Sequence, residues 1–213
     1  MDLSAPQGHS VNDGISKELC SLHYSSLDDA AAKVAELGQG ALLAKMDIRQ
    51  AYRNIPVAPE DKPLLGLRWN GHTYIDQVLP FGLRSTPMIF SAIADGLLWI
   101  MQKKGVSWAI HYIDDFLTMG APLTGQCLKN TLIMQSVCDD AGLPMEPSKS
   151  VGPTTSLVFL GIQIDSDKGE LRLPDEKLTE LQELITTWRG CKACRKRELL
   201  SLIGSLSHAC KVV

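Results

Sequence analysis

The sequence lacks any apolar stretch that is long enough to cross a membrane. The best candidate, residues 106–117, is short and is interrupted by a histidine and two aspartates. The chain also has no internal repeat, no low-complexity tract and no secretory signal at its polar N-terminus. These absences exclude membrane-spanning, repeat-array and secreted proteins. We therefore expect an intracellular protein of the cytoplasm and/or nucleus that has no membrane partner.

Basic residues and regularly spaced cysteines are also scarce. The chain has 21 Lys and Arg against 24 Asp and Glu, a net charge of −3 that disfavours a general nucleic-acid coat. Its six cysteines are irregularly spaced, which is typical of reduced thiols in an intracellular chain. Cys191, Cys194, His208 and Cys210 raise the alternative of a zinc site. We favour free thiols, because His-x-Cys is an unusual second half of such a site.

What the chain has is an ordinary globular composition, with 45% hydrophobic and 21% charged residues in 213 positions. Periodicity and turn residues predict helices at 26–37, 85–100, 125–141, 174–188 and 196–210, a strand at 41–48, and hairpins at 64–75, 108–119 and 157–173. We expect Ser26 and Asp29 to form a capping box, Ser85 or Thr86 to cap the second helix, and Asn70-Gly71 to form the turn of the first hairpin. Between residues 41 and 151 the order is strand, helix, strand, strand, helix, strand. We therefore predict an α+β fold whose core is a split βαβ (ferredoxin-like) antiparallel sheet with helices on one face.

The hairpin at 108–119 carries Asp114 and Asp115 at its tip, between two apolar runs. Two like charges at a tight turn repel each other, so they are either polar turn residues or ligands of a cation such as Mg²⁺ or Mn²⁺. In a split βαβ topology the strand that ends at Asp47 pairs beside this hairpin. Three carboxylates gathered there could hold two divalent ions ~4 Å apart, an arrangement that serves phosphoryl transfer.

The remaining aromatic residues have a simpler interpretation. We expect Trp69, Trp99, Trp108 and Trp188 to fill the hydrophobic core rather than to stack on bases. His111 precedes the hairpin tip, and a packing role is favoured for it over a catalytic one. The basic cluster at 192–197 is interpreted as a solvated start of a helix.

Five segments occur in the order of the motifs of reverse transcriptases, and together they are similar to that family. Tyr112-Ile113-Asp114-Asp115 resembles its Y-x-D-D motif, and Asp47 followed by Tyr52 resembles its first catalytic motif. The other three matches are Leu79–Pro87 with the L-P-x-G-x-x-x-x-P motif, Gly142-Leu143-Pro144 followed by Lys149 with the segment of the functional lysine, and Phe159-Leu160-Gly161 with the primer grip.

The resemblance implies two Mg²⁺ or Mn²⁺ ions and a set of catalytic groups. Asp47 and Asp114 would be metal ligands, supplemented by the carbonyl of Ile48, and Asp115 would be the third and looser carboxylate. Lys149 could protonate the leaving pyrophosphate. The implied partners are an RNA or DNA template, a DNA primer and deoxynucleoside triphosphates (dNTPs), while the oligomeric state stays unknown.

The resemblance also implies a nucleotide site and a primer site. Tyr52 would lie under the deoxyribose and fill the space that a 2′-hydroxyl needs, while Phe81 and Gly82 would line the pocket. The backbone amides of Gln50 and Ala51 could reach the triphosphate. Leu160 and Gly161 would position the primer end.

The same resemblance divides the chain. It implies partial fingers with a lead-in helix at 1–40, a palm at 41–156 with a fingers insertion around 58–78, a primer-grip hairpin at 157–173 and the start of a thumb at 174–213. Because the family has further fingers strands, a longer thumb and an RNase H domain, we expect this length of chain to bind metal but to polymerise poorly or not at all.

Two questions about origin and role stay open at this point. The segments Gly8–Ile15 and Leu202–Leu206 look most similar to DIRS-type retrotransposons, with gypsy-like elements and pararetroviruses close by. The alternative to a polymerase is a catalytically silent retroelement-derived fragment that acts as a structural or interaction module. The intact Asp47, Asp114 and Asp115 favour the polymerase.

Overall fold

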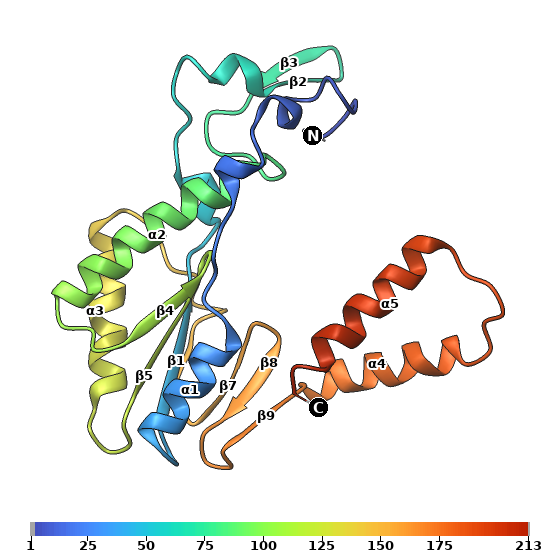
Figure 1. Ribbon diagram of the computed structural model, residues 1–213. Coiled ribbons are helices and arrows are strands. Elements are labelled where there is room, and N and C mark those ends of the chain that lie inside the picture. The colour runs from blue at the N-terminus through green and yellow to red at the C-terminus, as the bar shows by residue number, and fades with distance from the viewer. Residues whose placement is uncertain (1–2, 213) are drawn as a thin grey trace.

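A four-stranded antiparallel sheet lies at the centre of the computed structural model, which describes residues 3–212 (Figure 1). The strand order is β4–β5–β1–β6, so the first strand pairs beside the central hairpin, as predicted. These strands are β1 (Leu42–Asp47), β4 (Ala109–Tyr112), β5 (Asp115–Gly120) and β6 (Val151–Thr154). The split βαβ prediction is therefore confirmed.

One face of this sheet is covered by α2 (Thr86–Lys103) and α3 (Gln126–Asp140). The core beneath them includes Met46 of β1, Phe116 of β5 and Phe90 of α2, each at most 4% exposed. Pro87 occupies the first turn of α2, where its missing N–H costs nothing. Ser85 is the N-cap residue of α2, as predicted, but its side chain makes no capping hydrogen bond, and the Thr86 hydroxyl donates to the carbonyl of Pro80 at 3.1 Å.

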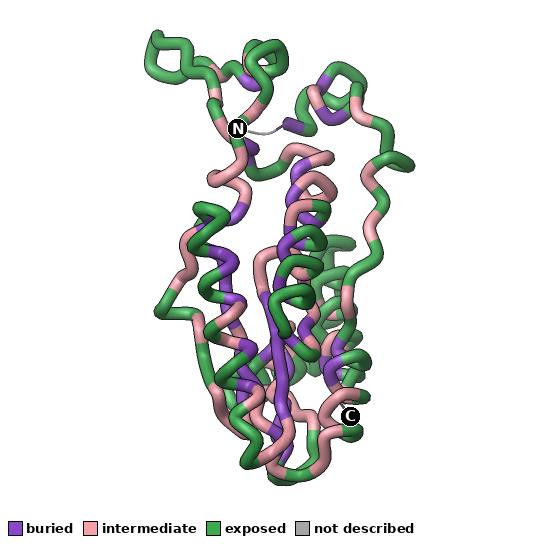
Figure 2. Tube along the Cα trace, turned by 90° about the vertical axis from the view of Figure 1, so that its left-hand side faces the viewer, coloured by how far each residue is buried: buried purple, intermediate pink, exposed green. Residues whose placement is uncertain are grey.

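The other face is covered by α1 (Leu27–Leu37) and a second, three-stranded sheet (Figure 1). Side chains alternate along β5, so that Phe116 points to α2 and α3 whereas Leu117 joins the core under α1. Ser26 caps α1 with a capping box to Asp29, as its spacing predicted. The buried residues therefore run through the middle of the molecule on both sides of the sheet (Figure 2).

The second sheet corrects the predicted hairpin at 157–173. It has three strands, β7 (Ser156–Phe159), β8 (Ile162–Asp165) and β9 (Glu170–Arg172), in sequential order. Leu160 and Gly161 interrupt the run with φ of 50° and 76°, which are the two positive angles of a type I′ hairpin turn. The apolar character of 157–164 hid this turn, because only Gly161 is a usual turn residue.

A smaller lobe follows β1 and contains β2 (Gly66–Trp69), β3 (His72–Ile75) and short 3₁₀ helices. Asn70-Gly71 forms the predicted two-residue turn, with φ of 49° and 78°. The 3₁₀ segments of the chain are Val11–Gly14, Glu18–Cys20, Ala51–Asn54 and Lys62–Leu65. The N-terminal segment runs back beside this lobe (Figure 1).

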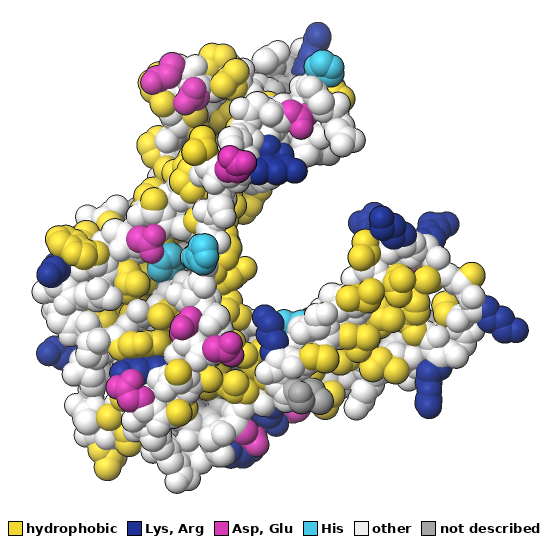
Figure 3. Space-filling model, viewed as in Figure 1, with side chains coloured by type: hydrophobic (Ala, Val, Ile, Leu, Met, Phe, Trp, Pro, Cys, Tyr) yellow, Lys and Arg dark blue, Asp and Glu magenta, His cyan; other side chains and the backbone are white. Residues whose placement is uncertain are grey.

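The last two helices, α4 (Asp175–Trp188) and α5 (Lys196–Ala209), form an arm that projects from the sheets (Figure 1). Of their residues only Ala209 is buried. Figure 3 shows apolar side chains gathered on this arm with Lys and Arg around them. The exposed large apolar residues of the two helices are Leu178, Ile185, Leu199, Leu200 and Ile203.

Three of the four tryptophans contradict the expectation that they fill the core. Trp69 is 72% exposed, Trp99 is 61% exposed, and Trp188 lies on α4, which has no buried residue. Trp108 packs at the edge of the core under α1. His111 packs as expected, with its ring stacked on Phe116 at 5.4 Å between centroids. None of the helices within residues 3–212 is long and apolar enough to span a bilayer.

Candidate active site

Asp47 and Asp115 lie directly opposite each other in the β1–β5 ladder. Directly paired residues of antiparallel strands point to the same face, so the two carboxylates share one side of the sheet. Asp114 is held to the same place by the backbone, because the amide of Ile48 donates to its carbonyl oxygen at 3.2 Å. Segments that are 67 positions apart therefore bring all three predicted carboxylates together.

The turn that presents Asp114 is strained. Tyr112 pairs with Asp115, which leaves Ile113 and Asp114 as the two turn residues, and Ile113 has a φ of +56°. A β-branched residue in the left-handed region costs on the order of 1–3 kcal/mol, and such residues cluster at functional sites. The turn therefore accepts strain to hold the aspartate pair at the tip of the hairpin.

Two ammonium groups accompany the carboxylates. Lys149 Nζ donates to both oxygens of Asp47 at 3.3 Å, and Lys45 Nζ lies 3.9 Å from Asp115 Oδ1. Burial raises the pKa of Asp114 and of Asp115, and the neighbouring carboxylates raise the pKa of both further. The hydrogen bond to Asp47 raises the pKa of Lys149, so its ammonium keeps its proton more firmly than a free lysine does.

The donor set fits magnesium or manganese by its chemistry, because all three side chains offer carboxylate oxygens. In the part of the chain that the structure describes, however, no three Asp, Glu, His or Cys side chains converge tightly enough to hold a metal ion. Asp47 and Asp115 face the cationic groups of Lys149 and Lys45, which balance the same negative charge that a metal ion would balance.

Tyr52 and Phe81 lie together beside this site. The Tyr52 ring is 5.4 Å from that of Phe81 and 5.7 Å, edge-on, from that of Phe90. Burial and then the charge of Asp114 raise the pKa of Tyr52, so the phenol lies within electrostatic range of that carboxylate. Phe81 is 67% exposed, so its ring is available to a ligand. The structure thus brings together two of the residues predicted to line the nucleotide pocket.

Gln50 and Ala51 lie where the chain leaves β1. Gln50 is exposed and has a φ of 51°, and Ala51 is buried against the core. A hollow of about 480 Å³ opens here, lined by Gln50, Arg53, Leu67, Asp76, Pro80 and Phe81. Arg53 Nη1 lies 2.8 Å from the Asp76 carboxylate. This ion pair adds two residues to the site beyond those predicted from the sequence.

A residue outside the five motifs holds the loop of Gly82. The side chain of Asn12 is buried, donates to the carbonyl of Gly82 at 2.8 Å and accepts from the amide of Arg84 at 2.8 Å. The Arg84 guanidinium returns the contact by donating to the carbonyls of Asn12 and Ile15. The only sequence signal was the turn-rich segment around Asn12, which the sequence analysis used for subgroup placement alone.

The turn Leu160-Gly161 lies on the same side of the central sheet as the carboxylates, in the core layer that also contains Leu43 and Leu117. A Cβ at Gly161 would come within 3.0 Å of His208 Nε2. A side chain at this position would require the His208 ring to shift by a few tenths of an ångström, and the φ of 76° also favours glycine. The turn predicted to position the primer is in contact with the arm.

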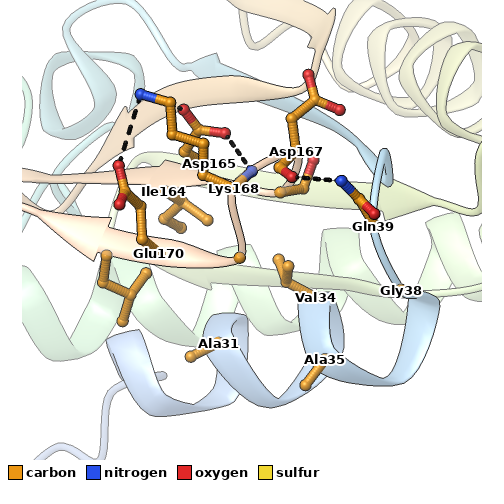
Figure 4. A pocket seen from close by; sticks show the side chains of 13 residues that line it. Ala31, Val34, Ala35, Gly38, Gln39, Ile164, Asp165, Asp167, Lys168 and Glu170 are labelled. Carbon is orange, nitrogen blue, oxygen red and sulfur yellow. Dashed lines mark hydrogen bonds and ion pairs between the residues drawn. The ribbon is translucent and has the colours of Figure 1, made fainter.

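Another hollow, of about 460 Å³, lies between α1 and the β8–β9 turn (Figure 4). Lys168 pairs with two of its carboxylates, since Lys168 Nζ lies 3.9 Å from Asp165 Oδ2 and 3.7 Å from Glu170 Oε1. Ser166 binds the carbonyl of Ala41, which places this hollow at the opposite end of β1 from Asp47. It is separate from the carboxylate site.

The six cysteines form no disulfide. Cys127 and Cys138 are buried in α3, and burial raises the pKa of each thiol to about 11. Cys191, Cys194 and Cys210 are exposed.

Comparison with known proteins gives matches of three kinds. The model of the family described as "Reverse transcriptase (RNA-dependent DNA polymerase)" matches residues 4–164. Polyprotein P3 of Commelina yellow mottle virus is 26% identical over 166 residues, which are 74% of this chain and 8% of that protein. The Gag-Pol polyprotein of Walleye dermal sarcoma virus is 28% identical over 164 residues, 76% of this chain and 9% of that protein. The chain thus spans a small part of these relatives.

Solved structures support the fold. The foamy viral protease–reverse transcriptase bound to double-stranded DNA matches with a TM-score of 0.65 and 21% identity, over 81% of this chain and 28% of that one. The same viral protein bound to an RNA/DNA hybrid matches with a TM-score of 0.65 and 20% identity, over 80% and 21%. These matches confirm the predicted α+β fold of a polymerase palm with parts of fingers and thumb. Since the family model covers well over half of its residues, the chain belongs to the reverse transcriptase (RNA-dependent DNA polymerase) family.

Proposed function

We propose that this chain is the polymerase part of an RNA-directed DNA polymerase of a retroelement. It would join dNTPs to the 3′-hydroxyl of a DNA primer on an RNA or DNA template. The observation that carries the proposal is the placement of Asp47 directly opposite Asp115, with Asp114 beside them in a strained turn. A fold alone does not need three carboxylates on one buried edge, because their mutual repulsion and burial are unfavourable.

The carboxylates of Asp47, Asp114 and Asp115, with the carbonyl of Ile48, would hold two Mg²⁺ or Mn²⁺ ions. When bound, such ions activate the attacking hydroxyl and neutralise the charge that develops on the leaving group. The rigid strand pairing that sets Asp47 against Asp115 then keeps their oxygens in place during the reaction.

The protein groups around the carboxylates take the remaining roles. Lys149 holds a proton next to Asp47 and would deliver it to the leaving pyrophosphate oxygen. Tyr52, supported by Phe90, would lie against the sugar and leave no space for a 2′-hydroxyl. Phe81 would contact the base or sugar with its exposed ring. Gly82, whose carbonyl is bound by Asn12, would fix the position of the Phe81 ring in the pocket.

Two further contacts complete the proposed substrate site. Gln50 lines the hollow beside Phe81, so the backbone amides of Gln50 and Ala51 would bind the triphosphate there. The Leu160-Gly161 turn would hold the primer end, and its contact with His208 would tie that end to the arm.

The proposal extends to the parts of the chain and its origin. The fingers part would be 1–40, the palm 41–156 with an insertion around 58–78, the primer grip 157–173 and the start of the thumb 174–213. Residues 1, 2 and 213 lie outside the described residues. From the segments Gly8–Ile15 and Leu202–Leu206, we propose that the chain comes from a DIRS-type or gypsy-like element. We also propose that it acts inside the cell.

Single-nucleotide addition tests the function. The 213-residue chain is incubated with an RNA template, a DNA primer, dNTPs and Mg²⁺ or Mn²⁺, and product is compared with that of Asp114→Asn. We expect addition by the wild type and a loss of about 10²-fold or more in the variant, the scale seen when a transition-state electrostatic contact is removed. Equal behaviour of the two proteins would instead support a silent, retroelement-derived structural module.

A further inference from the structure

Lys45 occupies a position where the strand pattern calls for an apolar residue. It lies on β1 between Leu43 and Asp47 on the same face, and it pairs directly with Leu117 of β5. Leu43 and Leu117 are both fully buried in the core beneath α1. A lysine in such a place costs free energy unless its charge has a partner.

The partner of Lys45 is Asp115. The Lys45 ammonium lies 3.9 Å from Asp115 Oδ1, and the two side chains are only 20% and 28% exposed. A lysine that merely reached water would extend its amine away from the sheet, with an apolar stem along the surface. Here the ammonium lies within the carboxylate cluster, beside Asp115, instead of in open solvent.

The charge balance shows what Lys45 contributes. Three ionised carboxylates carry −3, and the two ammonium groups of Lys45 and Lys149 reduce this to −1. Lys149 pairs with Asp47 from a 62% exposed side chain beyond α3, so it can swing away. Lys45 comes from an inner strand of the sheet, and its side chain is only 20% exposed, so it has less freedom to leave Asp115.

We propose that Lys45 is a positioning residue that holds Asp115 through its ammonium and weakens the grip of that carboxylate on divalent cations. This inference rests on the proposed function, since it assigns Asp115 to the cation site. Asp115 then binds divalent cations most weakly of the three carboxylates, because the Lys45 ammonium already compensates part of its negative charge. Lys45 also prevents repulsion within the cluster while no divalent ion is bound.

Mn²⁺ binding to the chelator-treated chain, measured by calorimetry, tests the proposal. Replacement of Lys45 by the uncharged Lys45→Met is expected to tighten Mn²⁺ binding by roughly two- to fivefold, the range for loss of a partly exposed charge pair. The same variant should have a lower melting temperature in EDTA and a larger stabilisation by Mn²⁺ than wild type. Lys45→Arg, which keeps the charge, should retain wild-type binding.

A matched control separates this effect from general loss of a lysine. Lys33 is 17% exposed and pairs with Glu36 at 2.7 Å on α1, away from the carboxylates. Lys33→Met should leave Mn²⁺ affinity unchanged. In an Asp115→Asn background the effect of Lys45→Met should vanish, because a purely structural role would not depend on that carboxylate. If Lys45→Met does not fold, Lys45→Gln serves in its place.

The outcomes distinguish the inference from the function on which it rests. Mn²⁺ binding that is lost in Asp47→Asn and Asp114→Asn but unchanged in Lys45→Met overturns the role of Lys45 alone. Binding that survives in both aspartate variants overturns the cation site and the inference with it. A tightening in Lys45→Met that persists without the Asp115 carboxylate also contradicts the proposal.

Discussion

The ammonium of Lys149 lies 3.3 Å from both carboxylate oxygens of Asp47, although 102 positions separate the two residues. Lys149 reaches the site because the segment after α3 pairs with the end of β1, where the amide of Glu146 donates to the carbonyl of Asp47 at 2.8 Å. The contact therefore depends on backbone pairing and not on a chance approach of two surface charges. It links the lysine segment to the first catalytic motif.

Lys149→Ala is expected to slow single-nucleotide addition by about 10²-fold, the lower range for loss of a general acid. Rapid-quench measurement at saturating dNTP isolates the rate from binding. Lys168→Ala is the matched control, because Lys168 is similarly exposed and also pairs with a carboxylate, but lies at the other end of β1. A rate unchanged in Lys149→Ala would remove the proton-donor role.

Asp114→Asn is expected to stabilise the chain at neutral pH in EDTA. Burial raises the pKa of Asp114 in the folded chain, so the folded state holds that proton more tightly than the unfolded state does. Stability is then lost as the pH rises from the ordinary value of 3.8 through the raised pKa. The melting temperature of Asp114→Asn should exceed that of wild type above this window.

The comparison of wild type with Asp114→Asn also predicts the behaviour at low pH, and it has a control variant. Below pH 3.8 both proteins carry an uncharged side chain at position 114, so their melting temperatures should converge. Asp139→Asn, an exposed site on α3, should not show this dependence. A lower melting temperature for Asp114→Asn at neutral pH would contradict the unfavourable burial of the carboxylate.

Tyr52→Ala is expected to reduce discrimination against ribonucleotides by at least about tenfold, because a side chain that fills space for one small group contributes 1–3 kcal/mol. Tyr52→Phe keeps the ring against Phe90 and should behave as wild type. The measurement is the ratio of kcat/KM for a dNTP and for the matching ribonucleotide. Tyr74→Ala, at a half-exposed position of β3, is the control. An unchanged ratio in Tyr52→Ala would argue against the gate.

Asn12→Ala is expected to raise the KM for dNTP by roughly tenfold with a smaller change in kcat, since a loop displaced by about 1 Å loses up to 10²-fold in efficiency. The substitution removes the bonds to Gly82 and Arg84 that fix the loop behind Phe81. Gln102→Ala, exposed on α2, is the control. If kcat alone falls, Asn12 does not act through the nucleotide pocket.

Much of the fold follows from local patterns that act over a few residues. The apolar runs of β1 and β5, the Asn70-Gly71 turn and the Ser26–Asp29 capping box each have a near-neighbour cause, and each was predicted. The turn at Leu160-Gly161 was missed because leucine rarely takes a positive φ. Trp69 and Trp99 were misplaced because a large apolar side chain can also face solvent on a lobe or helix surface.

The sequence by itself determined that three carboxylates, a tyrosine and a lysine occur in the order of one enzyme family. It also determined that the strand of Asp47 would meet the hairpin of Asp114, because the element order permits few topologies. Only the tertiary structure decided which cations face the carboxylates and that Asn12 holds the Gly82 loop. Those contacts join residues that are 70 or more positions apart, or depend on which face of a strand is buried. No local pattern encodes such contacts, because chain packing alone brings their partners together.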